Sequence, residues 1–210
     1  MFIGHFAIAY LVYYLYPNIP FWVALLGVSF PDLLWPIFVI LGIEQVKIKS
    51  NSPLQKDLKF THYPYSHSLV ISTIIAFVFG GVLSFLLNNW AILILFPILS
   101  ASHWVLDIIV HRKDLPVLGF SKKDFKVGLG LWNHGRAAFI LEYVFYVTFT
   151  ILFAPSGLIF LLFILGTIFH ILNANSFLGL TKKNLFAKGK YTYPIITLLG
   201  FGLFIIIASL

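Results

Sequence analysis

Residues 90–112 read WAILILFPILSASHWVLDIIVHR, and this stretch decides the fold. Few polar residues interrupt it, and a helix of about 20 such residues crosses the hydrocarbon core of a bilayer. We therefore expect a membrane-spanning helix here. His103, Asp107 and His111 follow one another at intervals of four residues. Because a helix turns about 100° per residue, they fall within an arc of roughly 80° on one face.

The composition of the whole chain also indicates a membrane protein. Its 210 residues are 60% apolar and 10% charged, and the mean hydropathy is +0.97. Soluble domains have about 45–50% apolar and about 25% charged residues, so this chain could not bury its apolar surface in a core of its own. Cysteine is absent, which excludes disulfides and thiolate zinc sites. A metal would need histidine, aspartate or glutamate ligands.

Further apolar runs predict an all-α polytopic membrane bundle of about six or seven helices. We expect these helices at about residues 4–16, 20–43, 67–87, 90–112, 136–154, 157–175 and 193–210. The first is short and ends at Pro17 and Pro20, because proline cannot continue the hydrogen-bond ladder. One integral membrane domain covers residues 1–210, with candidate metal ligands within about 1–145 and accessory helices within about 146–210.

The basic residues lie in alternate connections between the expected helices. All 14 lysine and arginine residues fall within 47–59, 112–136 and 182–190, and the other connections hold none. Alternate connections share one side of the membrane, and by the positive-inside rule that side is cytoplasmic. The net charge of +7 is therefore a signal of membrane topology, strengthened by anionic lipid headgroups. We expect no nucleic-acid partner, because the sequence shows no basic reader element.

Several ionisable residues fall inside or beside the expected helices, towards the cytoplasmic side. Charged groups within a membrane are costly and mark functional sites. Imidazole and carboxylate together suit Zn²⁺, with Mn or Fe as alternatives, and we expect one or two divalent ions. Two ions about 3.5–4 Å apart can clamp a phosphoester, with Asp32 or Glu142 as the catalytic carboxylate. The expected metal ligands are His5, Asp32, His67, His103, Asp107, His111 and Asp114.

Structural roles stay open for several of these residues. The polar face of residues 103–111 could form hydrogen bonds between helices. Asp114 could end its helix before Pro116. Glu142 could form a structural pair with Arg136. The sequence does not decide whether the site includes His62, His134 and His170, the last of which suits a packing role.

Five short motifs resemble a known family. They are GH at 4–5, PDLLWP at 31–36, YPYSHSL at 63–69, SHWVLDIIVHRKDLP at 102–116 and GLGLWN at 128–133. Together they resemble bacterial membrane-bound metal-dependent hydrolases, a group that includes the LexA-binding inner-membrane-associated hydrolases. The resemblance covers about residues 1–145 and is most specific at 102–116. It implies a location in an inner (plasma) membrane.

The order of the ligands is more distantly similar to the superfamily of zinc-dependent phospholipase C and single-strand-specific nucleases. That pattern runs His, Asp, His, then His-x3-Asp, then His, then His-x3-Glu. The last pair departs, because His134 would need a carboxylate at Ala138, and Glu142 lies four residues further on. The resemblance implies hydrolysis of a phosphoester, and the membrane location then implies a phospholipid or other lipid phosphate as substrate. The positions that match, in order, are His5, Asp32, His67, His103, Asp107 and His111.

Two other functions stay open. A di-iron membrane oxygenase also uses histidines on membrane helices, but the chain lacks the closely spaced His-x-x-His-His cluster typical of such enzymes. An ion- or proton-coupled permease would need a polar path to the opposite face of the membrane. The outer halves of the expected helices are apolar, although His170 lies close to two asparagines.

Overall fold

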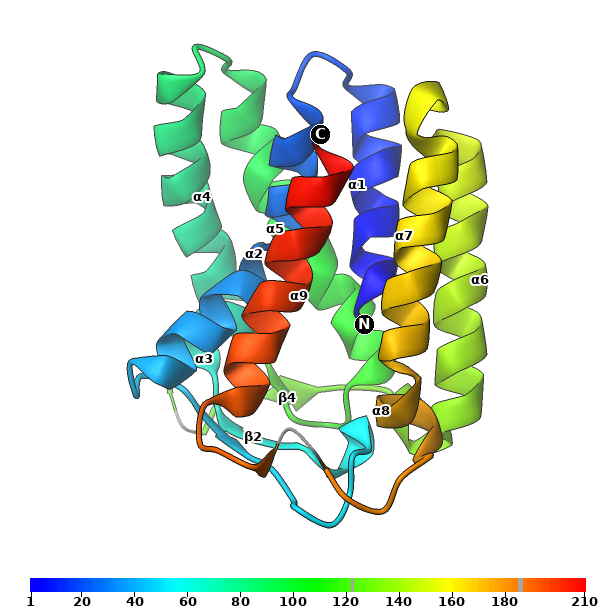
Figure 1. Ribbon diagram of the computed structural model, residues 1–210. Coiled ribbons are helices and arrows are strands. Elements are labelled where there is room, and N and C mark those ends of the chain that lie inside the picture. The colour runs from blue at the N-terminus through cyan, green and yellow to red at the C-terminus, as the bar shows by residue number, and fades with distance from the viewer. Residues whose placement is uncertain (122, 185–186) are drawn as a thin grey trace.

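The structure is a bundle of apolar helices (Figure 1). The computed structural model describes residues 1–121, 123–184 and 187–210. Its long helices lie within a few residues of the seven expected ranges, which confirms the predicted all-α bundle. They are α1 (Ile3–Leu15), α2 (Phe21–Ile40), α4 (Leu69–Leu86), α5 (Ala91–Val110), α6 (Gly135–Phe153), α7 (Ile159–Leu172) and α9 (Thr192–Ala208). The described residues also form two short helices that were not expected, α3 (Pro64–His67) and α8 (Ala174–Leu178).

Four helical segments are long and apolar enough to cross a membrane. They are α2, α4, α5 and the segment Leu131–Phe153, which contains α6. The apolar helices α1, α7 and α9 are shorter. Large apolar side chains face outward, as with Phe85 at 82% exposed and Phe160 at 77% exposed. Such a surface would be an aggregation hazard in water, but it suits contact with lipid tails.

The longer connections gather at one end of the bundle, the lower end in Figure 1. They include the antiparallel pair β1 (Gln45–Lys47) and β2 (Lys59–His62), and the pair β3 (Leu115–Pro116) and β4 (Lys126–Val127). Single 3-10 turns complete the described elements, at η1 (Gln55–Asp57), η2 (Leu131–His134) and η3 (Ser156–Leu158). The backbone amide of Asn184 donates to the carbonyl of Ser50 and ties two of these connections together. The described basic connections therefore share one end of the bundle.

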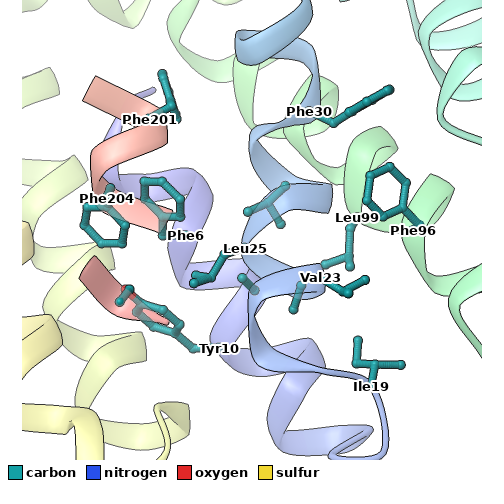
Figure 2. Packing of buried hydrophobic residues seen from close by; sticks show 14 of the residues in the cluster. Phe6, Tyr10, Ile19, Val23, Leu25, Phe30, Phe96, Leu99, Phe201 and Phe204 are labelled. Atoms are coloured by element: carbon teal, nitrogen blue, oxygen red, sulfur yellow. The ribbon is translucent and has the colours of Figure 1, made fainter. Parts of the chain in front are cut away.

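The apolar core lies between α1, α2, α5 and α9 (Figure 2). The ring of Phe6 stacks on that of Phe204 with 3.8 Å between their centroids, which joins α1 to α9. Gly27 lets α2 approach α5 closely, since an added Cβ would lie 2.9 Å from the Cβ of Leu99. Small residues at helix contacts are typical of membrane bundles. This close approach brings Asp32 of α2 beside the polar face of α5.

Candidate metal centre

Six of the expected ligands come together in the half of the bundle nearest the long connections. The side chains of Asp107 and His103 project from α5, and His111 directly follows that helix. His5 lies in the first turn of α1, and His67 ends α3. All of these are at most 5% exposed. The sixth, Asp32 in the middle of α2, has a side chain 17% exposed.

Asp107 lies at the centre of the cluster. Its Oδ1 atom is 3.3 Å from Nε2 of His5. Its Oδ2 atom is 3.3 Å from Nε2 of His103 and 3.4 Å from Nε2 of His111. The Nε2 atom of His67 lies 3.9 Å from the same oxygen. One carboxylate therefore faces four imidazole rings that come from three different helices and the residue after α5.

Asp32 forms a second face of the cluster. Its two oxygens lie 3.3 Å from Nε2 of His67 and 3.7 Å from Nε2 of His103. Two sets of three ligand atoms thus lie within 4.8 Å of one another, and both sets include His103. Ligand atoms about 2.1 Å from a tetrahedral ion lie about 3.4 Å from each other. The separations in this cluster fall close to that value, so these side chains could hold a metal ion.

The orientation of His103 also suits metal binding. Its Nδ1 atom lies 2.7 Å from the backbone carbonyl of Val28, which can only accept, so Nδ1 donates. The lone pair of the neutral ring is then on Nε2, which is buried, faces the two carboxylates and has no hydrogen-bond partner among the described residues. Metal-binding histidines usually donate their other ring N–H in this way.

His67 is oriented by two residues that the sequence reasoning missed, Ser66 and Glu44. The Ser66 hydroxyl donates to Oε2 of Glu44 at 2.6 Å, so it accepts from Nδ1 of His67 at 2.7 Å. Glu44 also accepts from the backbone amides of Tyr65 and Ser66. This chain of hydrogen bonds leaves Nε2 of His67 free to bind a cation beside Asp32. The only sequence signal was a lone acidic residue directly after an apolar run.

Burial gives the Glu44 carboxyl unusual acid–base behaviour. It raises the pKa of this group to about 7, although hydrogen bonds from Ser66 and Tyr65 act in the opposite direction. The ionised form of Glu44 is therefore held in the fold at a cost in stability. Such a cost is consistent with a group whose role is to orient its neighbours.

His111 is oriented by Asp114, one of the expected ligands. The Nδ1 atom of His111 lies 3.2 Å from Oδ1 of Asp114, so Asp114 contacts the side of the ring that faces away from the cluster. Burial would lower the pKa of His111, but Asp107 and Asp114 outweigh that effect and raise it to about 9. At pH 7 the ring carries both protons, and a cation bound by Nε2 would replace one of them.

The ring of His5 lies between polar groups, although neither ring nitrogen forms a hydrogen bond within the described residues. Its ring stacks on that of His103 at 3.6 Å between centroids, with 9° between the planes. Both nitrogens of His5 are buried without a hydrogen-bond partner in the part of the chain that the structure describes. The amino group of Met1 lies 2.7 Å from Oδ1 of Asp107, so this carboxylate oxygen already forms an ion pair with a positive group. Buried polar atoms without partners are rare, and a bound ion would satisfy them.

Glu142, the other expected catalytic carboxylate, contacts the start of α1. Its Oε1 atom accepts from the backbone amides of Phe2 and Gly4. A carboxylate in this position complements the exposed amides and the positive end of the helix dipole. No hydrogen bond or ion pair joins Glu142 to the clustered imidazoles among residues 1–121, 123–184 and 187–210. Glu142 thus holds the start of α1, the helix that carries His5. Its role as a catalytic base stays a prediction.

Three other histidines lie outside the cluster. His134 is exposed at the end of η2. His62 lines a separate surface cavity of about 430 Å³ near β2 and β4. The ring of His170 stacks on Phe139 and Tyr143, with centroid distances of 3.9 and 5.0 Å. The packing role suggested for His170 by the sequence agrees with these contacts.

The cluster borders a cavity of about 460 Å³. Asp32, His67, Asp107 and His111 line one part of it. This volume lies within the range of about 300–1,000 Å³ that is typical of small-molecule sites.

Comparison of the chain with known proteins finds no matching family model, no similar curated protein and no similar solved structure. The family expected from the motifs therefore stays a prediction.

Proposed function

We propose that this chain is a membrane-embedded, metal-dependent hydrolase that cleaves a phosphoester of a membrane lipid. The observation that carries the proposal is the shared orientation of His67, His103 and His111. Each ring has a hydrogen-bond partner at Nδ1, and each turns Nε2 towards the carboxylates of the cluster. Three imidazoles fixed in this way around two carboxylates are a suitable set of ligands for Zn²⁺, Mn²⁺ or Fe²⁺.

A divalent ion held by these residues would polarise a phosphoryl oxygen and lower the pKa of water near it. Asp32 is the carboxylate best placed for proton transfer, since it lines the cavity and is more exposed than Asp107. It would accept a proton from the water that attacks phosphorus, while the bond from phosphorus to the leaving oxygen breaks and that oxygen takes up a proton from solvent. Glu44 and Asp114 would hold the rings of His67 and His111 in place.

The proposed substrate follows from the location of the cluster. It lies close to the end of the bundle that holds the basic connections, and positive residues there attract anionic headgroups. By the positive-inside rule this end faces the cytoplasm, so the enzyme would act on the cytoplasmic leaflet of a plasma membrane. A phospholipid or other lipid phosphate would reach the cluster from that leaflet.

The first test compares the wild-type chain with Asp107→Asn after purification in detergent. We expect the wild type to contain one or two equivalents of Zn or Mn and to release product from phosphatidate or from bis(p-nitrophenyl) phosphate. Asp107→Asn should lose the metal, and its turnover should fall at least about 100-fold. Asp57→Asn removes a surface carboxylate that pairs with Lys49 and serves as the matched control.

Two results would contradict the proposal. One is equal turnover in the wild type and Asp107→Asn. The other is a chain without metal after reconstitution with Zn²⁺, Mn²⁺ and Fe²⁺ has been attempted. Iron together with oxygen-dependent turnover would instead support the di-iron oxygenase considered from the sequence.

A further inference from the structure

The cavity beside the cluster has a polar end and an apolar end. The cluster residues Asp32, His67, Asp107 and His111 line the polar end. The other end is formed by α7 and α9 and is mostly apolar, with Tyr193 and Thr197 as polar residues of α9. Its apolar side chains are Phe169, Leu172, Ile196, Leu199, Phe201 and Leu203. The lining of the cavity therefore matches an amphiphilic ligand, which has a polar part and an apolar part.

The apolar end opens sideways through the wall of the bundle. Leu172, Leu199 and Leu203 line the cavity and are also 72%, 55% and 48% exposed. They lie on apolar helices whose outer surfaces suit contact with lipid. The helix α9 packs mainly on α2 and contacts α7 only lightly.

We propose that the space between α7 and α9 receives a hydrocarbon chain of the substrate, which enters sideways from the bilayer while its phosphate reaches the cluster. This inference rests on the proposed function and adds to it the path and the binding place of the chain. Apolar walls hold water poorly, because burying apolar surface away from water is favourable. A hydrocarbon chain that moves from lipid into this space stays in apolar surroundings throughout.

Gly200 faces this space and provides the test. It lines the cavity on α9, and an added Cβ would lie 3.5 Å from the ring of Phe2. Gly202 lies two residues further along α9, about 200° around the helix. An added Cβ there has no atom within 4 Å. Gly200→Trp should therefore block the space, whereas Gly202→Trp makes the same chemical change outside it.

The experiment uses phosphatidate that carries a diazirine on one acyl chain, in phosphatidylcholine vesicles that contain the wild-type chain. After irradiation, mass spectrometry locates the adducts. We expect labels on the cavity side of α7 and α9, including the less exposed Phe169 and Phe201. Gly200→Trp should reduce these labels about tenfold or more, as is typical when a pocket loses space for a group. Gly202→Trp should retain them, and labels on outer positions such as Phe160 should not change.

The outcomes separate this inference from the proposed function, because labelling needs neither metal nor turnover. Labels confined to outer surfaces, or equal labelling in Gly200→Trp and Gly202→Trp, would overturn the chain-binding site even if the protein hydrolyses phosphatidate. Cavity labels that Gly200→Trp removes would support the site even if Asp107→Asn shows that turnover does not depend on the cluster. If Gly200→Trp does not insert into vesicles, Ile196→Trp on the same wall replaces it.

Discussion

Replacing Glu44 with glutamine should weaken metal binding although Glu44 is too far along the hydrogen-bond chain to be a ligand. Two backbone amides donate to Oε1 of Glu44 at 2.8 and 2.9 Å, so the glutamine oxygen must take that position. The glutamine NH2 group then faces the Ser66 hydroxyl and donates to it. Ser66 would turn its own proton towards Nδ1 of His67, and the ring proton would move to Nε2. That nitrogen could no longer bind a cation.

The size of the effect follows from the hydrogen bonds that must be given up. To bind the ion, the variant has to restore the proton on Nδ1 of His67 and lose one hydrogen bond in the chain through Ser66. A buried donor or acceptor that is left without a partner costs about 1–3 kcal/mol. We therefore expect the affinity for Zn²⁺ to fall about 10- to 100-fold, which is the range found for residues that orient metal ligands.

Isothermal titration with Zn²⁺ at pH 8 measures this effect, since the Glu44 carboxylate is ionised there. Asp57→Asn is the control, because it changes a carboxylate to an amide in the same connection, and Asp57 bonds to Lys49 and Ser52 instead of the His67 chain. An unchanged dissociation constant in Glu44→Gln would refute the orientation argument. An equal loss in Asp57→Asn would show that a general change of charge, and not the Ser66 relay, is responsible.

Two further predictions concern stability. The pKa of Glu44 is about 7 in the folded chain against an ordinary 4.5. Its contribution to stability is therefore present below pH 4.5 and is lost as the pH rises through about 7, a difference of up to about 3 kcal/mol. Thermal unfolding in detergent at pH 5 and pH 8 should show this difference in the wild type and not in Glu44→Gln; the same pH dependence in both chains would contradict it. Gly27→Ala should destabilise the fold by about 1–3 kcal/mol, because its Cβ would press on Leu99. Gly202→Ala should be tolerated, and equal melting temperatures for the two glycine variants would argue against close packing of α2 on α5.

The sequence predicted most of the fold because membrane helices are specified by local composition. An apolar run of about 20 residues can hardly be anything else in a bilayer. Turns such as Pro17 to Pro20 were visible for the same reason. The short helices α3 and α8 were not predicted, since each has at most five residues and their form depends on neighbouring segments.

The candidate site was predictable only where one helix carries it. The period of an α-helix is enough by itself to place His103 and Asp107 on one face. The contacts of Glu44 and Glu142 depend on segments far away in the sequence, since Glu142 meets the start of α1 across 138 residues. The spacing of residues along the sequence does not predict such contacts. For the same reason the sequence did not distinguish Asp114 as a partner of His111 from Asp114 as a ligand.

The distribution of the two central carboxylates over α2 and α5 has a consequence for the biogenesis of the protein. Asp32 and Asp107 lie on separate helices, and each meets histidines of other elements only once the helices have packed together. Asp32 lies in the middle of α2, where an aspartate costs about 2.5–3.5 kcal/mol on insertion, which roughly six well-placed leucine or isoleucine residues offset. Asp107 lies near the end of α5, where the cost is smaller. The apolar excess of α2 and α5 therefore serves translocon insertion as well as packing. A cation bound by these residues would be captured only after the helices have associated, and it would then join segments that are distant in the sequence.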